Sequence, residues 1–176
     1  CIVPYTRGRE RSRRMEDILR EVEELKASGR KEVVLLGQNV NAYGKDLKME
    51  DGFTQLLVAV AKTGIERISF YTSHPRDYSE TTIDAMRDYP NIMPFLHLPV
   101  QSGSDEVLRR MARGYTVERY KQLYDNLKKK VPHIAFTTDL IVGFPNETDE
   151  EFEATLDLVR YCRFDMAYAF IYSPRA

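Results

Sequence analysis

The sequence predicts an α/β fold built on parallel strands, and three patterns support this prediction. Short apolar runs rich in β-branched residues alternate with amphipathic helical patterns along most of the 176 residues. Residues 33–36 are apolar at every position, which is typical of parallel strands that helices cover on both faces. The predicted strands recur at distances that suit strand–loop–helix units, with starts at Val33, Ile68, Pro94, Phe136 and Met166.

Glycine, proline and N-capping residues mark the ends of the predicted helices. The clearest boundary is Thr148, which with Glu151 forms a capping box ahead of an apolar helical pattern. The other predicted helices are a pattern from Met15 to Leu25 with Gly29 as C-cap, residues 53–63 ended by Gly64, a helix capped by Ser79 that runs to about Asp88, and residues 117–131 ended by Pro132.

The length of the chain limits the architecture. A closed barrel of eight strand–helix units needs about 250 residues, so either a truncated barrel or an open α/β sheet is expected. No linker or low-complexity stretch interrupts the sequence, which indicates one domain or a piece of a larger protein. The sequence begins at Cys1 without a methionine and stops after Ala176, and we therefore expect a fragment.

Composition excludes several classes of protein. Lys and Arg number 26 against 27 Asp and Glu, so the net charge of −1 creates no general attraction to nucleic acid. No apolar run is long enough to span a bilayer, no signal segment opens the chain, and no membrane association is expected. Two cysteines, Cys1 and Cys162, are too few for a disulfide framework, so we expect a reducing compartment, the cytoplasm.

Polar residues follow the predicted strands at the place where α/β proteins bind ligands. The carboxyl ends of parallel strands meet at one edge, so these residues are expected to lie together and hold a polar small molecule. For any single segment, ordinary turn residues are the alternative. The segments are Gly37-Gln38-Asn39, Thr72-Ser73-His74, Gln101-Ser102-Gly103 and Tyr172-Ser173.

Asp139 is the most specific of these signals because it interrupts an apolar strand. A carboxylate buried there costs free energy unless it is hydrogen-bonded or paired. At the mouth of a barrel it could accept both hydroxyls of a ribose. The alternative is a buried Asp paired with an Arg.

The remaining chemical signals are weak. The sequence lacks a glycine-rich dinucleotide fingerprint, a P-loop, a His-Glu-x-x-His pair and a Cys-x-x-Cys pair, and His74, His97 and His133 show no metal-ligand spacing. The basic stretch of residues 7–14 could contact phosphates or be a solvated loop. Cys1 could be a cut end, a lipidated terminus or one ligand of a metal site. Alone it cannot hold an iron–sulfur cluster, because such a cluster needs three or four thiolates.

Several stretches, in order along nearly the whole chain, resemble the methylthiotransferase family of radical-SAM enzymes. The first, residues 1–8 followed by Arg11-Ser12-Arg13, is similar to the stretch that begins at the third cysteine of that family's Cys-x-x-x-Cys-x-x-Cys motif. The others are Leu35-Leu36-Gly37-Gln38-Asn39-Val40-Asn41-Ala42-Tyr43, Thr72-Ser73-His74-Pro75-Arg76-Asp77, His97-Leu98-Pro99-Val100-Gln101-Ser102-Gly103-Ser104, Met111-Ala112-Arg113-Gly114-Tyr115-Thr116, Asp139-Leu140-Ile141-Val142-Gly143-Phe144-Pro145 and Phe170-Ile171-Tyr172-Ser173-Pro174-Arg175.

The resemblance implies a partial, TIM-like (β/α)6 radical-SAM barrel, of which strands two to six are present. Residues 1–176 would then be a piece of the radical-SAM core domain, without the amino-terminal second-cluster domain and the carboxyl-terminal RNA-binding domain. With one of three cluster cysteines, this piece is expected to hold no intact cluster and to be inactive alone.

The versions Gly-Gln-Asn-Val-Asn and Pro-Val-Gln-Ser-Gly-Ser look like the tRNA branch of the family rather than the ribosomal-protein branch. The resemblance therefore implies that the parent protein adds a methylthio group to C2 of N6-dimethylallyladenosine beside the tRNA anticodon. The implied cofactors are S-adenosylmethionine and two [4Fe-4S] clusters, with an electron-donor protein as a further partner.

The resemblance also implies roles for single residues. Cys1 would be the third cluster ligand. The other positions follow the contacts of related barrels: Gln38 with Thr72 or Ser73 at the methionine amino group, Arg113 at the methionine carboxylate, Gln101 and Asp139 at the ribose, and Gly143 and Tyr172 at the adenine.

Three other functions stay open. One is a sibling methylthiotransferase that acts on threonylcarbamoyladenosine in tRNA or on a ribosomal protein. Another is a non-catalytic barrel fragment that binds RNA or a partner through the basic stretch. The last is a phosphate-binding barrel enzyme, which requires a phosphate nest after the last strands.

Overall fold

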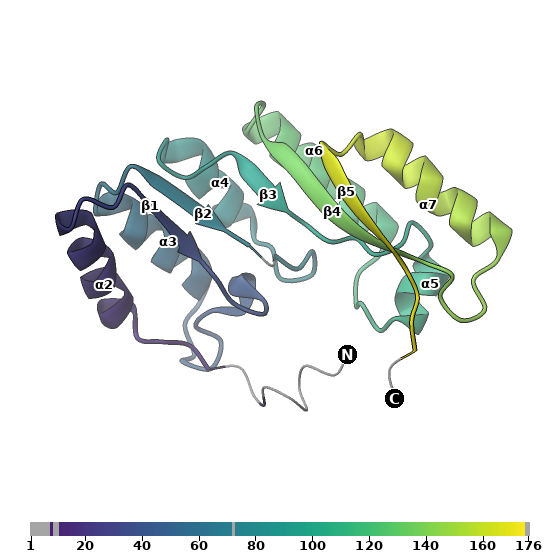
Figure 1. The fold of residues 1–176 in the computed structure, drawn as a ribbon, viewed down its shortest axis with the longest axis horizontal. Helices are drawn as coiled ribbons and strands as arrows, with labels where there is room; N and C mark the ends of the chain where they lie inside the picture. Colours follow the sequence, from purple (N-terminus) through teal and green to yellow (C-terminus); the bar gives the residue numbers. More distant parts are fainter. Residues whose placement is uncertain (1–7, 9–10, 72, 175–176) are drawn as a thin grey trace.

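The computed structural model describes residues 8, 11–71 and 73–174, and Figure 1 shows their arrangement. Helices and parallel strands alternate, as the sequence predicts. The strands are β1 (Glu32–Leu35), β2 (Arg67–Phe70), β3 (Phe95–His97), β4 (Ala135–Val142) and β5 (Met166–Ile171). The helices are α2 (Met15–Ala27), η1 (Val40–Ala42, a 3-10 turn), α3 (Gly52–Lys62), α4 (Glu80–Asp88), α5 (Asp105–Arg110), α6 (Val117–Lys130) and α7 (Asp149–Cys162).

The strands pair in parallel and in chain order, but they form two sheets rather than one. β1 pairs with β2, with Val33 opposite Ile68, and β3, β4 and β5 form a second sheet in which Asp139 lies opposite Tyr168. All described pairings are parallel, which confirms the predicted fold class.

The break between the two sheets falls just before β3. The Asn91 carbonyl accepts from the Ile68 amide, and the Met93 amide donates to the Ile68 carbonyl, so the chain begins to pair with β2. The next amide on that side, that of Phe95, donates to the Met93 carbonyl at 2.8 Å instead of to β2, so the ladder ends there. The rings of Tyr71 and Phe95 lie edge-to-face across the break, with their centroids 5.8 Å apart.

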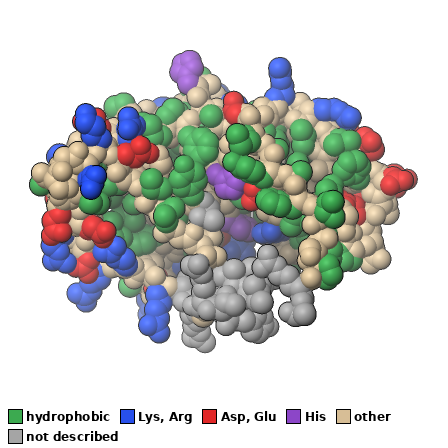
Figure 2. Space-filling model, viewed as in Figure 1, with side chains coloured by type: hydrophobic (Ala, Val, Ile, Leu, Met, Phe, Trp, Pro, Cys, Tyr) green, Lys and Arg blue, Asp and Glu red, His purple; other side chains and the backbone are tan. Residues whose placement is uncertain are grey.

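The two faces of the strands have different surroundings. Helices α3, α4 and α6 lie behind the strands in the view of Figure 1, and side chains on that face, such as Ile68, Leu96 and Phe136, are fully buried. The opposite face is called here the inner wall, and it includes Val34, Leu36, His97, Thr137 and Asp139. It looks toward the viewer and carries many hydrophobic side chains (Figure 2).

The inner wall corrects one expectation from the sequence. Residues 33–36 were predicted to be covered on both faces, yet Val34 is 42% exposed and Leu36 is 75% exposed. Successive residues of a strand alternate between faces, and no described element packs over the inner wall at these residues. The apolar run therefore indicates the inside of an open, barrel-like arc rather than a sheet between two helical layers.

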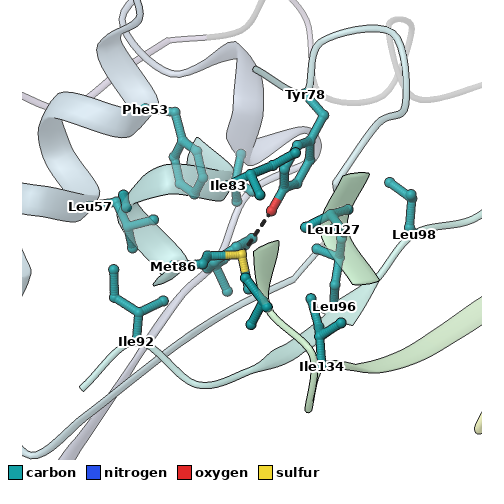
Figure 3. Packing of buried hydrophobic residues seen from close by; sticks show 14 of the residues in the cluster. Phe53, Leu57, Tyr78, Ile83, Met86, Ile92, Leu96, Leu98, Leu127 and Ile134 are labelled. Atoms are coloured by element: carbon teal, nitrogen blue, oxygen red, sulfur yellow. Dashed lines mark hydrogen bonds between the residues drawn. The ribbon is translucent and has the colours of Figure 1, made fainter. Parts of the chain in front are cut away.

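The core lies between the strands and the helices behind them. Figure 3 shows Phe53 and Leu57 of α3, Ile83 and Met86 of α4 and Leu127 of α6 packed in one cluster around β3. The Tyr78 hydroxyl, buried in this cluster, donates to the Met86 sulfur at 3.0 Å (Figure 3). Burial of this tyrosine raises its pKa well above the usual range. Cys162, expected from its place on α7 to be a core residue, is fully buried.

The caps predicted from the sequence are present. The Thr148 hydroxyl accepts from the Glu151 amide, and the Glu151 carboxylate accepts from the Thr148 amide, which completes the capping box. The Ser79 hydroxyl accepts from the Thr82 amide at the start of α4. Two short elements, α5 and η1, were missed because neither is long enough to show a helical period.

Gly103 connects the loop after β3 to helix α7. Its amide donates to the Thr155 hydroxyl at 2.8 Å, and a Cβ atom added here would lie 2.4 Å from the Ala154 carbonyl oxygen and 2.5 Å from the Thr155 Cα. Both obstacles are backbone atoms, which no change of rotamer can move. Only glycine lets the loop lie this close to the helix.

We predict that Gly103→Ala lowers the free energy of unfolding by about 1–3 kcal/mol, because the methyl group forces the loop and α7 apart. Thermal unfolding followed by circular dichroism measures the loss. Gly37→Ala is the matched control, since its added Cβ meets only the Val40 side chain at 3.4 Å and the Val40 backbone at 3.9 Å. Equal melting temperatures for the two variants would contradict this account of the contact.

Candidate functional site

The loops that follow the carboxyl ends of the strands form the candidate site. They are residues 36–46 after β1, 71–78 after β2, 98–104 after β3 and 143–147 after β4. Because every described strand is parallel, these ends lie on one edge of the two sheets. This edge is the one that the sequence predicts for a ligand.

Asp77 links the loops after β1 and β2. Its carboxylate accepts from the side-chain amide of Asn39 at 2.7 Å, from the Lys45 ammonium at 2.7 Å and from the Arg76 guanidinium at 3.0 Å. The side chain is only 6% exposed. Burial alone would raise the pKa of Asp77, but the hydrogen bonds from Arg76, Lys45 and Asn39 outweigh it and hold the pKa far below its usual value.

A second bond joins the same two loops. The side-chain oxygen of Asn41 accepts from the His74 amide at 3.1 Å. The His74 ring is half-buried, and this burial lowers its pKa; Asp77 opposes the effect, whereas Arg76 and Arg113 add to it. His74 therefore favours its neutral form more strongly than a free histidine does.

Arg113 belongs to the same cluster through its neighbours. Tyr115 lies edge-to-face against the His74 ring, with centroids 5.4 Å apart, and its hydroxyl donates to the Val100 carbonyl at 2.9 Å. Tyr115 therefore ties the segment around Arg113 both to the loop after β2 and to the loop that contains Gln101. Burial raises the pKa of this tyrosine.

Several buried polar atoms in this cluster have no hydrogen-bond partner among the described residues. Buried polar groups in proteins are nearly always satisfied, so an unsatisfied set on one edge marks a place where a ligand or water binds. The atoms are Asn39 Oδ1, Asn41 Nδ2, Ser73 Oγ and Arg113 Nε.

Gln101 lies beside Asp139 through backbone contacts. The Gln101 amide donates to the Asp139 carbonyl at 2.8 Å, and the Ile141 amide donates to the Gln101 carbonyl at 2.9 Å. Gln101 has a φ of 73°, a left-handed conformation that is uncommon outside glycine, and is 7% exposed. Such strain is often found at functional sites.

Asp139 lies on the inner wall, with its side chain 30% exposed. Its Oδ2 atom is 3.5 Å from Nε2 of His97, and among the described ion pairs it has no arginine partner. The alternative of an Asp–Arg pair therefore finds no support in the described part of the chain.

Gly143 and Tyr172 lie at the ends of β4 and β5. Gly143 has a φ of 71°, and its amide donates to Glu147 Oε2 at 2.5 Å, as does the Phe144 amide at 3.2 Å. The Tyr172 ring packs edge-to-face on Phe144 with centroids 5.1 Å apart. A carboxylate therefore already occupies two of the amides that the phosphate-binding alternative would need as free donors.

The other predicted positions contribute less to this cluster. Gln38 is exposed at the end of β1. Cys1 and Thr72 lie outside the described residues. In the basic stretch, Arg13 pairs with Glu21 at 2.7 Å on the surface, a contact that is worth little.

The inner wall contains a hollow of about 320 Å³ below the site edge. Three aromatic rings line most of it, together with polar groups of β3 and β4. The lining residues are Tyr71, Phe95, His97, Thr137, Met166 and Tyr168.

The described residues hold no cluster of three or more His, Cys, Asp or Glu side chains able to bind a metal. Cys162 is free and buried, and burial raises the pKa of its thiol to about 12, which opposes the thiolate form that metals bind. Within the part of the chain that the structure covers, no helix has both the length and the apolar character needed to cross a membrane.

Sequence reasoning did not single out Asp77, Asn41, Tyr115 or His97 as site residues. All four lie within the motifs quoted above, but Asp77 and Asn41 have their partners in the other loop 38 and 33 residues away in the sequence. Only the folded chain shows which of the many polar loop residues lie next to one another.

The Radical SAM superfamily matches residues 1–159 of the chain. The chain is also similar to curated proteins named tRNA-2-methylthio-N(6)-dimethylallyladenosine synthase. Identity is 58% over 176 residues for Bacillus licheniformis (99% of this chain, 35% of the relative) and 60% over 176 residues for Caldicellulosiruptor saccharolyticus (99% and 37%). The chain thus spans little more than a third of these relatives' length.

Solved structures share the fold of this chain. The methyltransferase TsrM from Kitasatospora setae, with cobalamin and a [4Fe-4S] cluster bound, is similar with a TM-score of 0.71 and 17% identity (93% of this chain, 31% of that chain). Streptococcus suis SuiB bound to S-adenosylmethionine is similar with a TM-score of 0.62 and 16% identity (92% and 34%). The expected radical-SAM type of partial barrel is thereby confirmed.

Asp77 generates a prediction about stability and pH. Because its pKa is lower in the folded state than in the unfolded state, the ionised carboxylate stabilises the fold above its unfolded pKa of about 4. That contribution declines as the pH falls further, when protons compete for the carboxylate. Asp77→Asn should cost about 1–3 kcal/mol at pH 7.

Urea unfolding of both proteins between pH 7 and pH 3 measures the difference. We expect a constant gap above pH 5 that narrows below pH 4. Asp88→Asn is the control, since Asp88 is exposed and pairs with Arg87 on the surface. A gap for Asp77→Asn that stays constant down to pH 3 would show that the charge of Asp77 does not stabilise the loops.

Proposed function

The chain belongs to the radical SAM superfamily, and from this premise we propose that it forms part of the catalytic core of a tRNA methylthiotransferase. The proposed reaction of the whole protein adds a methylthio group to C2 of N6-dimethylallyladenosine next to the tRNA anticodon. The names of the similar relatives support this substrate over threonylcarbamoyladenosine or a ribosomal protein.

The remaining parts of this activity are assigned to the rest of the protein. We place a second-cluster domain and an RNA-binding domain there, because the similar relatives are nearly three times as long. tRNA and an electron-donor protein are the proposed partners, and the cytoplasm, where tRNA is found, is the proposed location.

The observation that carries the proposal is the set of unpartnered polar atoms at the strand ends. Asn39 donates its Nδ2 to Asp77, so its Oδ1 atom faces elsewhere as an acceptor. Asn41 uses its Oδ1 atom for the His74 amide, so its Nδ2 atom is left as a donor. An acceptor and donors close together are what an α-amino acid requires, with its positive ammonium and negative carboxylate.

S-adenosylmethionine carries such an amino acid group, and the residues fit it. We assign the amino group to Asn39 Oδ1 and Ser73 Oγ. Gln38 and Thr72, which the resemblance implies for the same group, stay proposed as further contacts. The carboxylate is assigned to Arg113, whose Nε atom is buried without a partner among the described residues.

The nucleoside part is assigned to the other end of the same edge. Asp139 and the neighbouring Gln101 would bind the ribose hydroxyls, since both lie where β4 meets the loop after β3. Gly143 leaves its Cα side open, with nothing within 4 Å of an added Cβ, and Tyr172 lies beside it on Phe144. This open surface next to an aromatic pair suits a planar base.

The described residues do not by themselves supply the ligands of an iron–sulfur cluster. We propose Cys1 as one thiolate ligand, with the others outside this sequence. When bound, the cluster and S-adenosylmethionine supply the radical chemistry. The contribution of this chain is to bind and orient the cofactor and to exclude water from it.

The proposed reaction predicts that Cys1 is essential in the intact protein. After anaerobic reconstitution with iron and sulfide, Cys1→Ala should form no detectable 5′-deoxyadenosine and leave N6-dimethylallyladenosine tRNA unmodified, because the cluster loses a ligand. Mass spectrometry of both products is the measurement. Cys162→Ala, the other cysteine of the chain, is the control and should keep its turnover. Undiminished cleavage in Cys1→Ala would exclude the ligand role.

The amino-acid site predicts weaker binding of S-adenosylmethionine when its polar atoms are removed. Asn39→Ala and Arg113→Gln should each raise the dissociation constant about tenfold, since each removes a hydrogen bond to a charged group. Arg109→Gln is the control, because Arg109 pairs with Glu106 on the exposed surface of α5. Isothermal titration calorimetry of the reconstituted enzyme with S-adenosylmethionine measures the dissociation constant of each variant. Equal dissociation constants for all three variants would contradict the assignment of the amino-acid site.

A further inference from the structure

Three polar side chains of the inner wall lie in a row. Thr137 and Asp139 are two residues apart on β4, and His97 lies on β3 opposite Thr137 in the strand register. The His97 Nδ1 atom is 2.9 Å from the Thr137 hydroxyl, and its Nε2 atom is 3.5 Å from Asp139 Oδ2. The imidazole thus bridges the hydroxyl and the carboxylate.

This arrangement selects which nitrogen of His97 carries a proton. An ionised carboxylate can only accept, so the position of Asp139 favours a proton on the Nε2 atom that faces it. In the neutral ring the Nδ1 atom is then an acceptor, and the Thr137 hydroxyl donates to it. In the charged ring Nε2 still faces the carboxylate with a proton, and Thr137 becomes the acceptor.

The row is held in place by its surroundings. The Thr137 residue is buried, and the Tyr168 ring lies edge-to-face to the imidazole with centroids 6.4 Å apart. The His97 side chain is 18% exposed, whereas that of Asp139 is 30% exposed. Of these two side chains His97 is the more buried, so the Asp139 carboxylate is the one that a ligand can reach.

We propose that His97 is a positioning residue that orients the Asp139 carboxylate toward the two hydroxyls of a ribose. This inference rests on the proposed function, in which Asp139 binds the ribose of S-adenosylmethionine. At 3.5 Å the Nε2–H group attracts one carboxylate oxygen without occupying it fully, so lone pairs stay available for the ligand. Thr137 contributes by holding the ring in place through the contact between its hydroxyl and Nδ1.

A purely structural histidine would behave differently. Its removal would disturb the wall between β3 and β4 and weaken every ligand to a similar extent. A residue that acts through Asp139 should affect only ligands that carry ribose hydroxyls. It should also have no effect once Asp139 has lost its charge.

The test uses the reconstituted intact enzyme with two probes, S-adenosylmethionine and an analogue of it that lacks both ribose hydroxyls. His97→Gln should weaken binding of the first about five- to tenfold, and binding of the second less than twofold. Asp139→Asn should show the same selectivity, and the double variant should bind no more weakly than Asp139→Asn alone.

Nitrogen NMR of the His97 ring gives a readout independent of binding and turnover. At a pH where the ring is neutral, we expect a protonated Nε2 and an unprotonated Nδ1. Thr137→Val, which keeps the shape but removes the hydroxyl, should leave the ring less firmly held and weaken S-adenosylmethionine about threefold. Thr137→Ser, which keeps the hydroxyl, should restore the affinity.

The outcomes separate this inference from the proposed function. Equal losses for both probes in His97→Gln, or additive losses in the double variant, would overturn the positioning role while the enzyme still binds S-adenosylmethionine. A wild-type enzyme that fails to bind S-adenosylmethionine at all would instead contradict the proposed function. A protonated Nδ1 in the wild type would also overturn the positioning role.

Discussion

A buried carboxylate sets the geometry of the candidate site. Asp77 draws the Asn39 amide, the Lys45 ammonium and its own neighbour Arg76 onto one group, and thereby holds the loop after β1 against the loop after β2. Hydrogen bonds to a charged group are among the stronger ones in proteins. Because this carboxylate takes the nitrogen of Asn39, the oxygen of that amide has to face elsewhere. One structural contact therefore determines the polarity that the site offers a ligand.

The two faces of the strands also have different roles, one in packing and one in function. Apolar side chains on the helix-covered face form the core. The inner wall carries the polar and ionisable groups of His97, Thr137 and Asp139. The two-residue alternation of a strand separates these roles without any change in backbone. The break after β2 leaves β3, β4 and β5 as one sheet, and the row formed by Thr137, His97 and Asp139 lies entirely within it.

Much of the site could be predicted from the sequence, but in an incomplete form. Asp139 stands out because a charged residue interrupts an apolar strand, and the structure places it on the inner wall as that pattern indicates. Its partner could not be predicted, since a histidine and an arginine satisfy the same rule for a buried carboxylate. Gln38 and Asn39 show the same limit: both are amides at a strand end, and of these two only Asn39 contacts a described residue of the next loop.

The order of helices and strands, the caps at Ser79 and Thr148 and the edge that carries the polar loops all follow from the sequence, because each depends on residues within a few positions of one another. The tertiary structure decided the rest. It placed Asp77 against Asn39, Tyr115 between His74 and Val100, and His97 between Thr137 and Asp139. These contacts join distant segments, and their geometry depends on how the packed strands and helices bring those segments together.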